Sequence, residues 1–235
     1  MKLLRTGLLL TVLLLSPLCT AANSSAPNWY AVELIVFRYT DPQAGSLETW
    51  PANPGNPDWN SAVALTSADA NPALVPFQEL PASSYRMDNA WQKLKRSHDY
   101  EPLLHIAWMQ PTADRGTAPA VRIGVPPITA LSAASVPAAA SAAVAAAAAA
   151  ENATPVYGTA KLSTTGPYLH FDLDMMYRGA PLKTGTPGVS QPLATAPPPQ
   201  FQWYRLAQDR RIDAGKMNYF DQPLFGVLLL VTPVK

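Results

Sequence analysis

The segment Trp29–Tyr39 constrains the fold most strongly. Its sequence, WYAVELIVFRY, is rich in β-branched and aromatic residues and contains neither glycine nor proline. Such a run predicts a β-strand with both faces largely buried. A second run, Phe225–Val231, is apolar throughout and predicts a central strand beside the first. Glu33 is the one charge inside the first segment, and we expect it at an edge position or paired with an arginine.

The remaining periodic segments predict one helix and several hairpin-connected strands. Tyr85–Ser97 carries Met87, Ala90, Trp91 and Leu94 on one helical stripe. In Tyr168–Arg178, apolar and polar residues alternate, which predicts one face on the core and one in water. Four further strands are expected at Pro102–Gln110, Tyr157–Ser163, Trp203–Ile212 and Met217–Phe220. The order predicts an α+β fold, in which an antiparallel sheet of about five to six strands has the one main helix packed on one face.

Proline and alanine mark three long connections. Residues 41–81 hold seven prolines, and residues 179–202 form a second proline-rich loop. Residues 112–154 are of low complexity, and eleven of the thirteen residues from 138 to 150 are alanine. Alanine has the highest helix propensity, so part of this insertion is expected to be helical. We therefore predict a single domain over 23–235, interrupted by this insertion and these loops.

The N-terminus has the features of an export signal. Lys2 and Arg5 precede the apolar run Leu8–Leu15, and small residues follow it, which predicts a cleaved signal peptide over 1–22. No membrane span is expected after cleavage, because this run is too short to cross a bilayer. The one cysteine, Cys19, lies inside the signal, so the mature chain has no thiol chemistry and no disulfide. Export without disulfides favours a bacterial periplasm.

Charge excludes one class of partner. The chain has 17 basic and 16 acidic residues, and removal of Lys2 and Arg5 with the signal leaves the mature protein close to neutral. This balance provides no electrostatic footprint for nucleic acid.

Arginines and aromatic residues near the C-terminus suggest a binding surface. Arginine matches carboxylates with two parallel hydrogen bonds, and aromatic rings stack on sugar faces. The candidate ligand-binding residues are Arg205, Arg210, Arg211, Trp203 and Tyr219, together with Trp50 and Trp59 of the first proline-rich loop. Alternatively, the arginines pair with Asp172, Asp174 and Asp209 across the sheet, and the two tryptophans hold their loop on the core.

A histidine and two aspartates form a second candidate. His170, Asp172 and Asp174 share one strand face, and His105 could join them from a neighbouring strand to bind a cation or act as an acid–base pair. A solvated face of alternating charges explains the same pattern, and a buried, hydrogen-bonded role explains His105. The sequence contains no known catalytic signature. We therefore predict no catalytic residue, no metal and no cofactor.

Four blocks, in order, resemble one family. They are WYAVELIVFRY, YEPLLHIAWMQP, TTGPYLHFDLDMMYR and RRIDAGKMNYFDQPLFGVLLLVTP. Together they resemble the CsiV family of periplasmic peptidoglycan-binding proteins. The resemblance implies a non-enzymatic protein that binds peptidoglycan and supports cell-wall assembly and cell shape. It also implies, as a partner, a lipoprotein activator of a bifunctional peptidoglycan synthase.

Two other functions remain open. The chain could act as a periplasmic adapter of a peptidoglycan synthase complex, docking through a strand edge or the tryptophan loop. It could also be a hydrolase or metalloprotein built on the histidine and aspartate residues described above.

Overall fold

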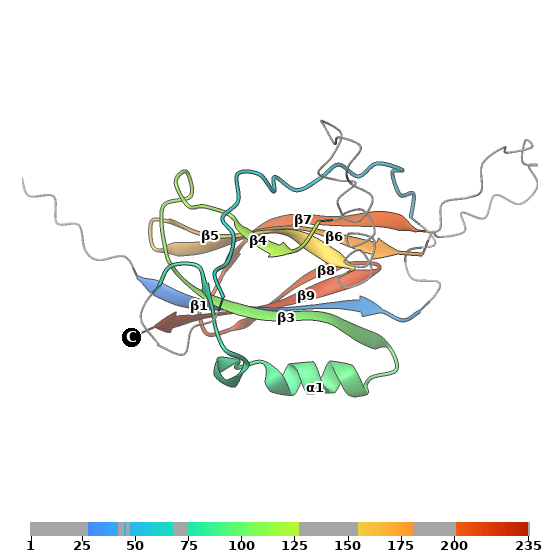
Figure 1. Ribbon diagram of the computed structural model, residues 1–235, viewed down its shortest axis with the longest axis horizontal. Helices are drawn as coiled ribbons and strands as arrows, with labels where there is room; N and C mark the ends of the chain where they lie inside the picture. Colours follow the sequence, from blue (N-terminus) through green and yellow to red (C-terminus); the bar gives the residue numbers. More distant parts are fainter. Residues whose placement is uncertain are drawn as a thin grey trace, which may run out of the picture.

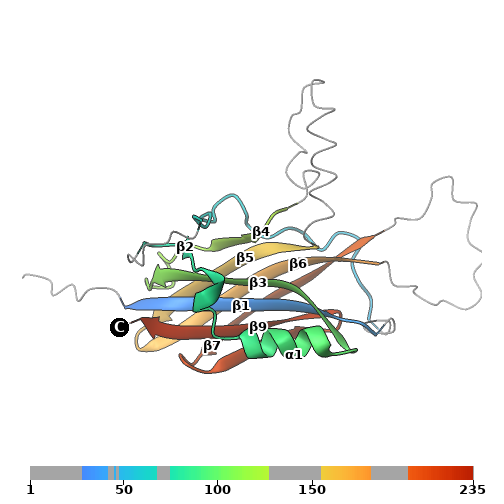
Figure 2. The same cartoon turned by 60° about the horizontal axis from the view of Figure 1, so that its bottom comes forward.

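The chain folds into two antiparallel sheets and a helix, stacked in three layers. The computed structural model describes residues 28–41, 45, 48–67, 75–126, 155–180 and 201–234. The first sheet has the strand order β2-β3-β1-β9-β8, and the second has the order β4-β5-β6-β7. The helix α1 lies on the side of the first sheet that faces away from the second (Figure 1). Figure 2, in which the bottom of Figure 1 comes forward, shows α1 in front of the first sheet.

The strands are β1 (Trp29–Tyr39), β2 (Gln78–Glu79), β3 (Tyr100–Pro111), β4 (Val121–Gly124), β5 (Val156–Thr165), β6 (Tyr168–Gly179), β7 (Gln202–Ile212), β8 (Met217–Gln222) and β9 (Phe225–Val234). The helices are α1 (Asp88–Arg96) and a short 3-10 helix (Ala82–Ser84). Within the described ranges, none of the helices has the length and apolar character needed to cross a membrane.

The expected single sheet of five to six strands is wrong. The strands divide between two sheets, and the chain passes from β7 in the second sheet into β8 in the first. Strand periodicity shows that a face is apolar, but it does not show whether a helix or another sheet covers that face. The expectation of one helix on one face is confirmed, since α1 packs on β3.

The two apolar strands behave as predicted. β1 lies between β3 and β9, and Val32 pairs with Trp108 on one side and Val231 on the other. β9 is flanked by β1 and β8, so it is an internal strand. Six consecutive residues of β1, Val32 to Phe37, are buried, and this requires cover on both faces of the strand.

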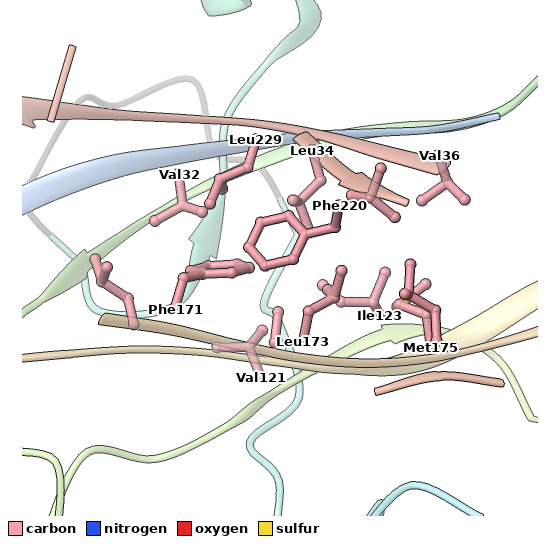
Figure 3. Close-up of a cluster of buried hydrophobic side chains, with 14 of the residues drawn as sticks. Val32, Leu34, Val36, Val121, Ile123, Phe171, Leu173, Met175, Phe220 and Leu229 are labelled. Atoms are coloured by element: carbon pink, nitrogen blue, oxygen red, sulfur yellow. The ribbon is translucent and has the colours of Figure 1, made fainter. Parts of the chain in front are cut away.

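The main core lies between the two sheets. Val32, Leu34 and Val36 of β1 face side chains of β6 across the core, as Figure 3 shows. The rings of Phe171 and Phe220 lie 5.8 Å apart, centroid to centroid, and join the sheets at the centre. Face-to-face packing of this kind is the usual core of a β-sandwich.

Two short strands occur in ranges expected to be loops. β2 lies within 41–81, and β4 lies within the 112–154 insertion. Val63 of the first loop forms a parallel bridge with Val121 of β4, so the two connections support each other. Short strands in proline-rich sequence have too little periodicity to be predicted. The signal peptide, the alanine-rich segment and most of the second proline-rich loop lie outside the described residues.

Candidate functional site

The outer face of the second sheet carries the polar side of β6. Leu169, Phe171 and Leu173 are buried in the core, whereas His170, Asp172 and Asp174 are half-buried on the opposite face. The alternation predicted for this strand is therefore confirmed from Leu169 to Met175, whereas Met176, expected on the solvent side, is buried. The segment 48–67 runs across this same side of the sheet (Figure 1).

Ion pairs occupy the carboxylates at the centre of this face. Asp172 Oδ2 lies 3.1 Å from Lys161 Nζ, and its Oδ1 lies 3.0 Å from Arg115 Nη2. The same Arg115 Nη2 lies 2.8 Å from Asp209 Oδ2, and Nη1 lies 3.1 Å from His170 Nδ1. The Arg115 guanidinium holds the pKa of Asp209 below its usual value. Arg115 thus joins two strands through their side chains.

Sequence reasoning missed Arg115 because it follows β3 in the range assigned to a low-complexity insertion. Its position comes from a non-local contact: Arg115 N donates to Thr164 O, and Thr164 N donates to Ala113 O. These bonds lay residues 113–115 alongside β5. No spacing in the sequence indicates this contact.

Arg205 is paired across the sheet, as the alternative interpretation predicted. Its Nε and Nη2 donate to the two oxygens of Asp174 at 2.8 and 2.7 Å. Its Nη1 donates to Pro54 O at 3.0 Å and holds the loop on the sheet. The bidentate geometry makes this a strong pair and leaves Arg205 little capacity for a ligand.

The three candidate arginines do not converge. Arg211 lies on the outer face, with its guanidinium 3.5 Å from the centroid of the Tyr168 ring. Arg210 points to the other side of β7, where it donates to Tyr219 O and lies over Phe220. Successive residues of a strand face opposite ways, so neighbours in sequence are separated in space.

The candidate aromatic residues are also distributed over different parts of the molecule. Trp59 and Trp203 both contact Tyr157, at centroid distances of 6.1 and 5.2 Å, on the outer side of the second sheet. Trp50 instead packs edge-on against Tyr204 at 5.2 Å and joins the main core. Tyr219 lies in the first sheet beside Tyr39 and Asp221. Trp50 therefore holds its loop on the core, whereas Trp59 and Trp203 meet at the ring of Tyr157.

His105 belongs to the first sheet and does not join His170. Its Nε2 lies 2.7 Å from Glu33 Oε1, and both side chains are almost fully buried. Glu33 is neither at an edge nor paired with an arginine: its carboxylate also accepts from the backbone N–H groups of Arg86 and Met87. This corrects the expectation for Glu33 and confirms that His105 is a buried, hydrogen-bonded residue. Among the described residues, no group of three or more His, Asp or Glu could hold a metal ion.

A groove of about 410 Å³ opens on the outer face of the second sheet. This groove is lined by Asp58, Ser61, Ala118, Pro119, Ala120, Thr159, Lys161, Asp172, Leu173 and Asp174. A smaller hollow of about 200 Å³ is lined by Asn56, Pro57, Asp58, Trp59, Asn60, Pro126 and Tyr157. Asp58 lines both, so the loop 56–61 forms the wall between them. The larger volume lies within the range of about 300–1,000 Å³ that is typical of ligand sites.

The wall of the groove is held in place from behind. Arg122 of β4 donates from Nε to Trp59 O at 3.0 Å and from Nη2 to Asn60 O at 3.4 Å. Its guanidinium also lies 5.6 Å from the centroid of the Trp59 ring. Tyr157 Oη donates to Asn56 Oδ1 at 3.1 Å. Sequence reasoning singled out Trp59 but neither Asp58 nor Arg122, whose roles depend on the pairing of the loop with β4.

The fold and the groove define a class of protein. The fold is a β-sandwich with a helix on one outer face and an open groove on the other. The chain belongs to the CsiV family: the family model described as "Peptidoglycan-binding protein, CsiV" matches residues 7–234. This match confirms the resemblance carried by the four sequence blocks. No curated protein and no solved structure shows a significant match to the chain.

Proposed function

We propose that this chain is a non-enzymatic periplasmic protein that binds peptidoglycan with the outer face of its second sheet and supports cell-wall assembly and cell shape. The observation that carries the proposal is the groove walled by the loop 56–61, in a chain whose family is described as peptidoglycan-binding. An open groove on a sheet face suits a polymer, because a long strand can lie across it.

Binding to purified sacculi tests this proposal. The chain is mixed with insoluble sacculi, and the pellet and supernatant are compared after centrifugation. We expect the protein in the pellet, and we expect Trp59→Ala to shift most of it to the supernatant. The control is Asp213→Ala, which removes an exposed carboxylate in the turn between β7 and β8, away from the groove. Wild-type protein that stays in the supernatant would contradict the proposal.

A second candidate is an adapter that docks a lipoprotein activator of a peptidoglycan synthase. Exposed apolar side chains in the first sheet favour it: Met217 is 54% exposed, Tyr219 39% and Tyr100 36%. Docking by addition of a strand to β8 is disfavoured, because side chains of β7 already bond two of its carbonyl groups. For this candidate, Met217→Asp should abolish co-purification of the partner and leave sacculus binding intact.

A separate assay tests the expectation that the chain does not hydrolyse peptidoglycan. His170, Asp172 and Asp174 all have cationic or hydrogen-bonding partners, so none is arranged as a free acid or base. We expect sacculi incubated with the chain to release no soluble muropeptides. Release that disappears in Asp172→Asn would instead support the hydrolase hypothesis.

A further inference from the structure

We propose that the groove recognises the N-acetylated sugar strand of peptidoglycan and not its peptide stems. This inference rests on the proposed function and adds the part of the polymer that is bound. The two parts differ in chemistry: the sugar strand presents hydroxyl and acetamido groups, whereas the stems carry carboxylates and an ammonium group.

The loop 56–61 offers hydrogen-bonding groups suited to neutral sugars. Asn56, Asp58 and Asn60 are exposed and alternate along the wall between the two hollows. Asp58 accepts from Ser61 Oγ at 2.5 Å and retains further lone pairs. Asn56 accepts from Tyr157 through Oδ1, which leaves its amide N–H groups to donate. Carboxylate acceptors beside amide donors match hydroxyl and acetamido groups.

Trp59 supplies an apolar surface next to these groups. The ring is half-buried, lines the smaller hollow and meets the edge of Tyr157. Aromatic side chains offer a large apolar area with little conformational entropy to lose. A sugar ring has an apolar face of C–H groups, so a half-exposed indole beside hydrogen-bonding side chains suits it better than a charged stem.

The charge of the groove disfavours the stems. Its lining has the carboxylates of Asp58, Asp172 and Asp174 but only one amine, that of Lys161. Lys161 is paired with Asp172, and Arg205 neutralises Asp174. Arg115 also pairs with Asp172, and Arg122 lies behind the wall. Asp58 is the one charged residue of the loop 56–61 and forms no ion pair with a described residue, so the wall itself presents a carboxylate to the ligand. Like charges across an interface are repulsive, and a neutral sugar strand avoids that cost.

The wall is preorganised, which lowers the entropy cost of binding. Val63 N donates to Ala120 O and Arg122 N donates to Val63 O, both at 2.8 Å, directly after the wall. Pro57 is buried before Trp59, and Ala62 is buried after it. The exposed polar groups therefore project from a backbone fixed on both sides.

Three ligands separate the two parts of the polymer. The unmodified chain is assayed against intact sacculi, against glycan strands from which an amidase has removed the stems, and against free stem peptides. Amidase hydrolysis leaves a free lactyl carboxylate on each muramic acid, so the denuded strands are compared at high ionic strength, where we expect binding within about threefold of intact sacculi. Oligomers of N-acetylglucosamine should compete with sacculi, and stem peptides should not. Added salt should change the affinity for oligomers of N-acetylglucosamine little, because these oligomers carry no charge to screen.

Variants place the binding at the loop 56–61, where Asp58 lines the groove and Asn60 lines the smaller hollow beside it. Asp58→Ala and Asn60→Ala should each weaken binding to denuded strands about tenfold, while Asp213→Ala binds like wild type. Loss of binding on removal of the stems, or competition by stem peptides, would overturn the sugar assignment and leave the proposed function standing. Failure to bind intact sacculi would overturn the proposed function and this inference together. The competition measurements use unmodified protein, so they distinguish binding of the sugar strand from binding of the peptide stems even if a variant fails to fold.

Discussion

Arg210 Nη1 donates a 2.8 Å hydrogen bond to the Tyr219 carbonyl oxygen, which lies on the free edge of β8. Gln208 Nε2 donates similarly to Asp221 O at 2.9 Å. The Arg210 guanidinium also lies 4.6 Å from the centroid of the Phe220 ring. β7 and β8 are the last strands of their sheets, so these side chains cover an edge that would otherwise be open to pairing with another chain.

Arg210→Ala should therefore destabilise the fold and promote self-association, without weakening sacculus binding. Loss of a charged hydrogen bond and a cation–π contact at an exposed position should lower the free energy of unfolding by about 1–2 kcal/mol. Urea denaturation measures the loss, and light scattering detects the association. Arg211→Ala is the matched control, because Arg211 lies on the outer face, over Tyr168. An equal loss in both variants would contradict the edge role.

Glu33→Gln should detach the start of α1 from the first sheet. The Glu33 carboxylate accepts from Arg86 N at 2.8 Å and Met87 N at 2.9 Å, and lies 2.7 Å from His105 Nε2. An amide has one acceptor oxygen and turns an N–H group toward existing donors, so we expect a loss of about 3 kcal/mol. Hydrogen exchange at residues 86–96 should accelerate. Glu101→Gln, which removes an exposed pair with Arg38, should cost less than about 1 kcal/mol.

The contribution of Glu33 should disappear in acid. Burial raises the pKa of Glu33, but the hydrogen bonds from His105 and from two backbone N–H groups outweigh it, so the pKa lies below its ordinary value of 4.5. A group with a lowered folded-state pKa stabilises the fold above its unfolded pKa, and the stability is lost as the pH falls through the folded-state pKa. The stability difference between wild type and Glu33→Gln should therefore be constant near neutral pH and shrink below pH 4.5. A stability difference between the two proteins that grows as the pH falls would instead mean that folding raises the pKa of Glu33.

Gly158→Ala should prevent correct pairing of β5 with β6. A Cβ atom at this position would lie 2.2 Å from Asp174 O and 2.7 Å from Met175 Cα. Both are backbone atoms of β6 and cannot move without shifting the strand, so we expect a loss of about 3 kcal/mol or more. Gly116→Ala is the control, because nothing lies within 4 Å of its Cβ position. Thermal unfolding of the two variants, followed by circular dichroism, gives the comparison.

Much of the fold was accessible from local patterns. β1, β6 and β9 and the helix α1 were predicted, because long apolar runs and clear periodicity identify an element from its own residues. β2 and β4 were missed, since short strands are formed by their partners more than by their own sequence. The split into two sheets was missed for a related reason, because the choice between a helix and a sheet as cover depends on residues far along the chain.

The sequence by itself determined which segments form long strands, which face of β6 is apolar, and membership of the CsiV family, because these depend on residue type and spacing. Only the tertiary structure decided which charges meet. It separated Arg205, Arg210 and Arg211, paired Arg205 with Asp174, brought Arg115 back over β6 and β7, and placed Asp58 and Trp59 beside a groove. The physical reason is that an ion pair or a groove forms between segments distant in the chain, and its geometry depends on strand order and register.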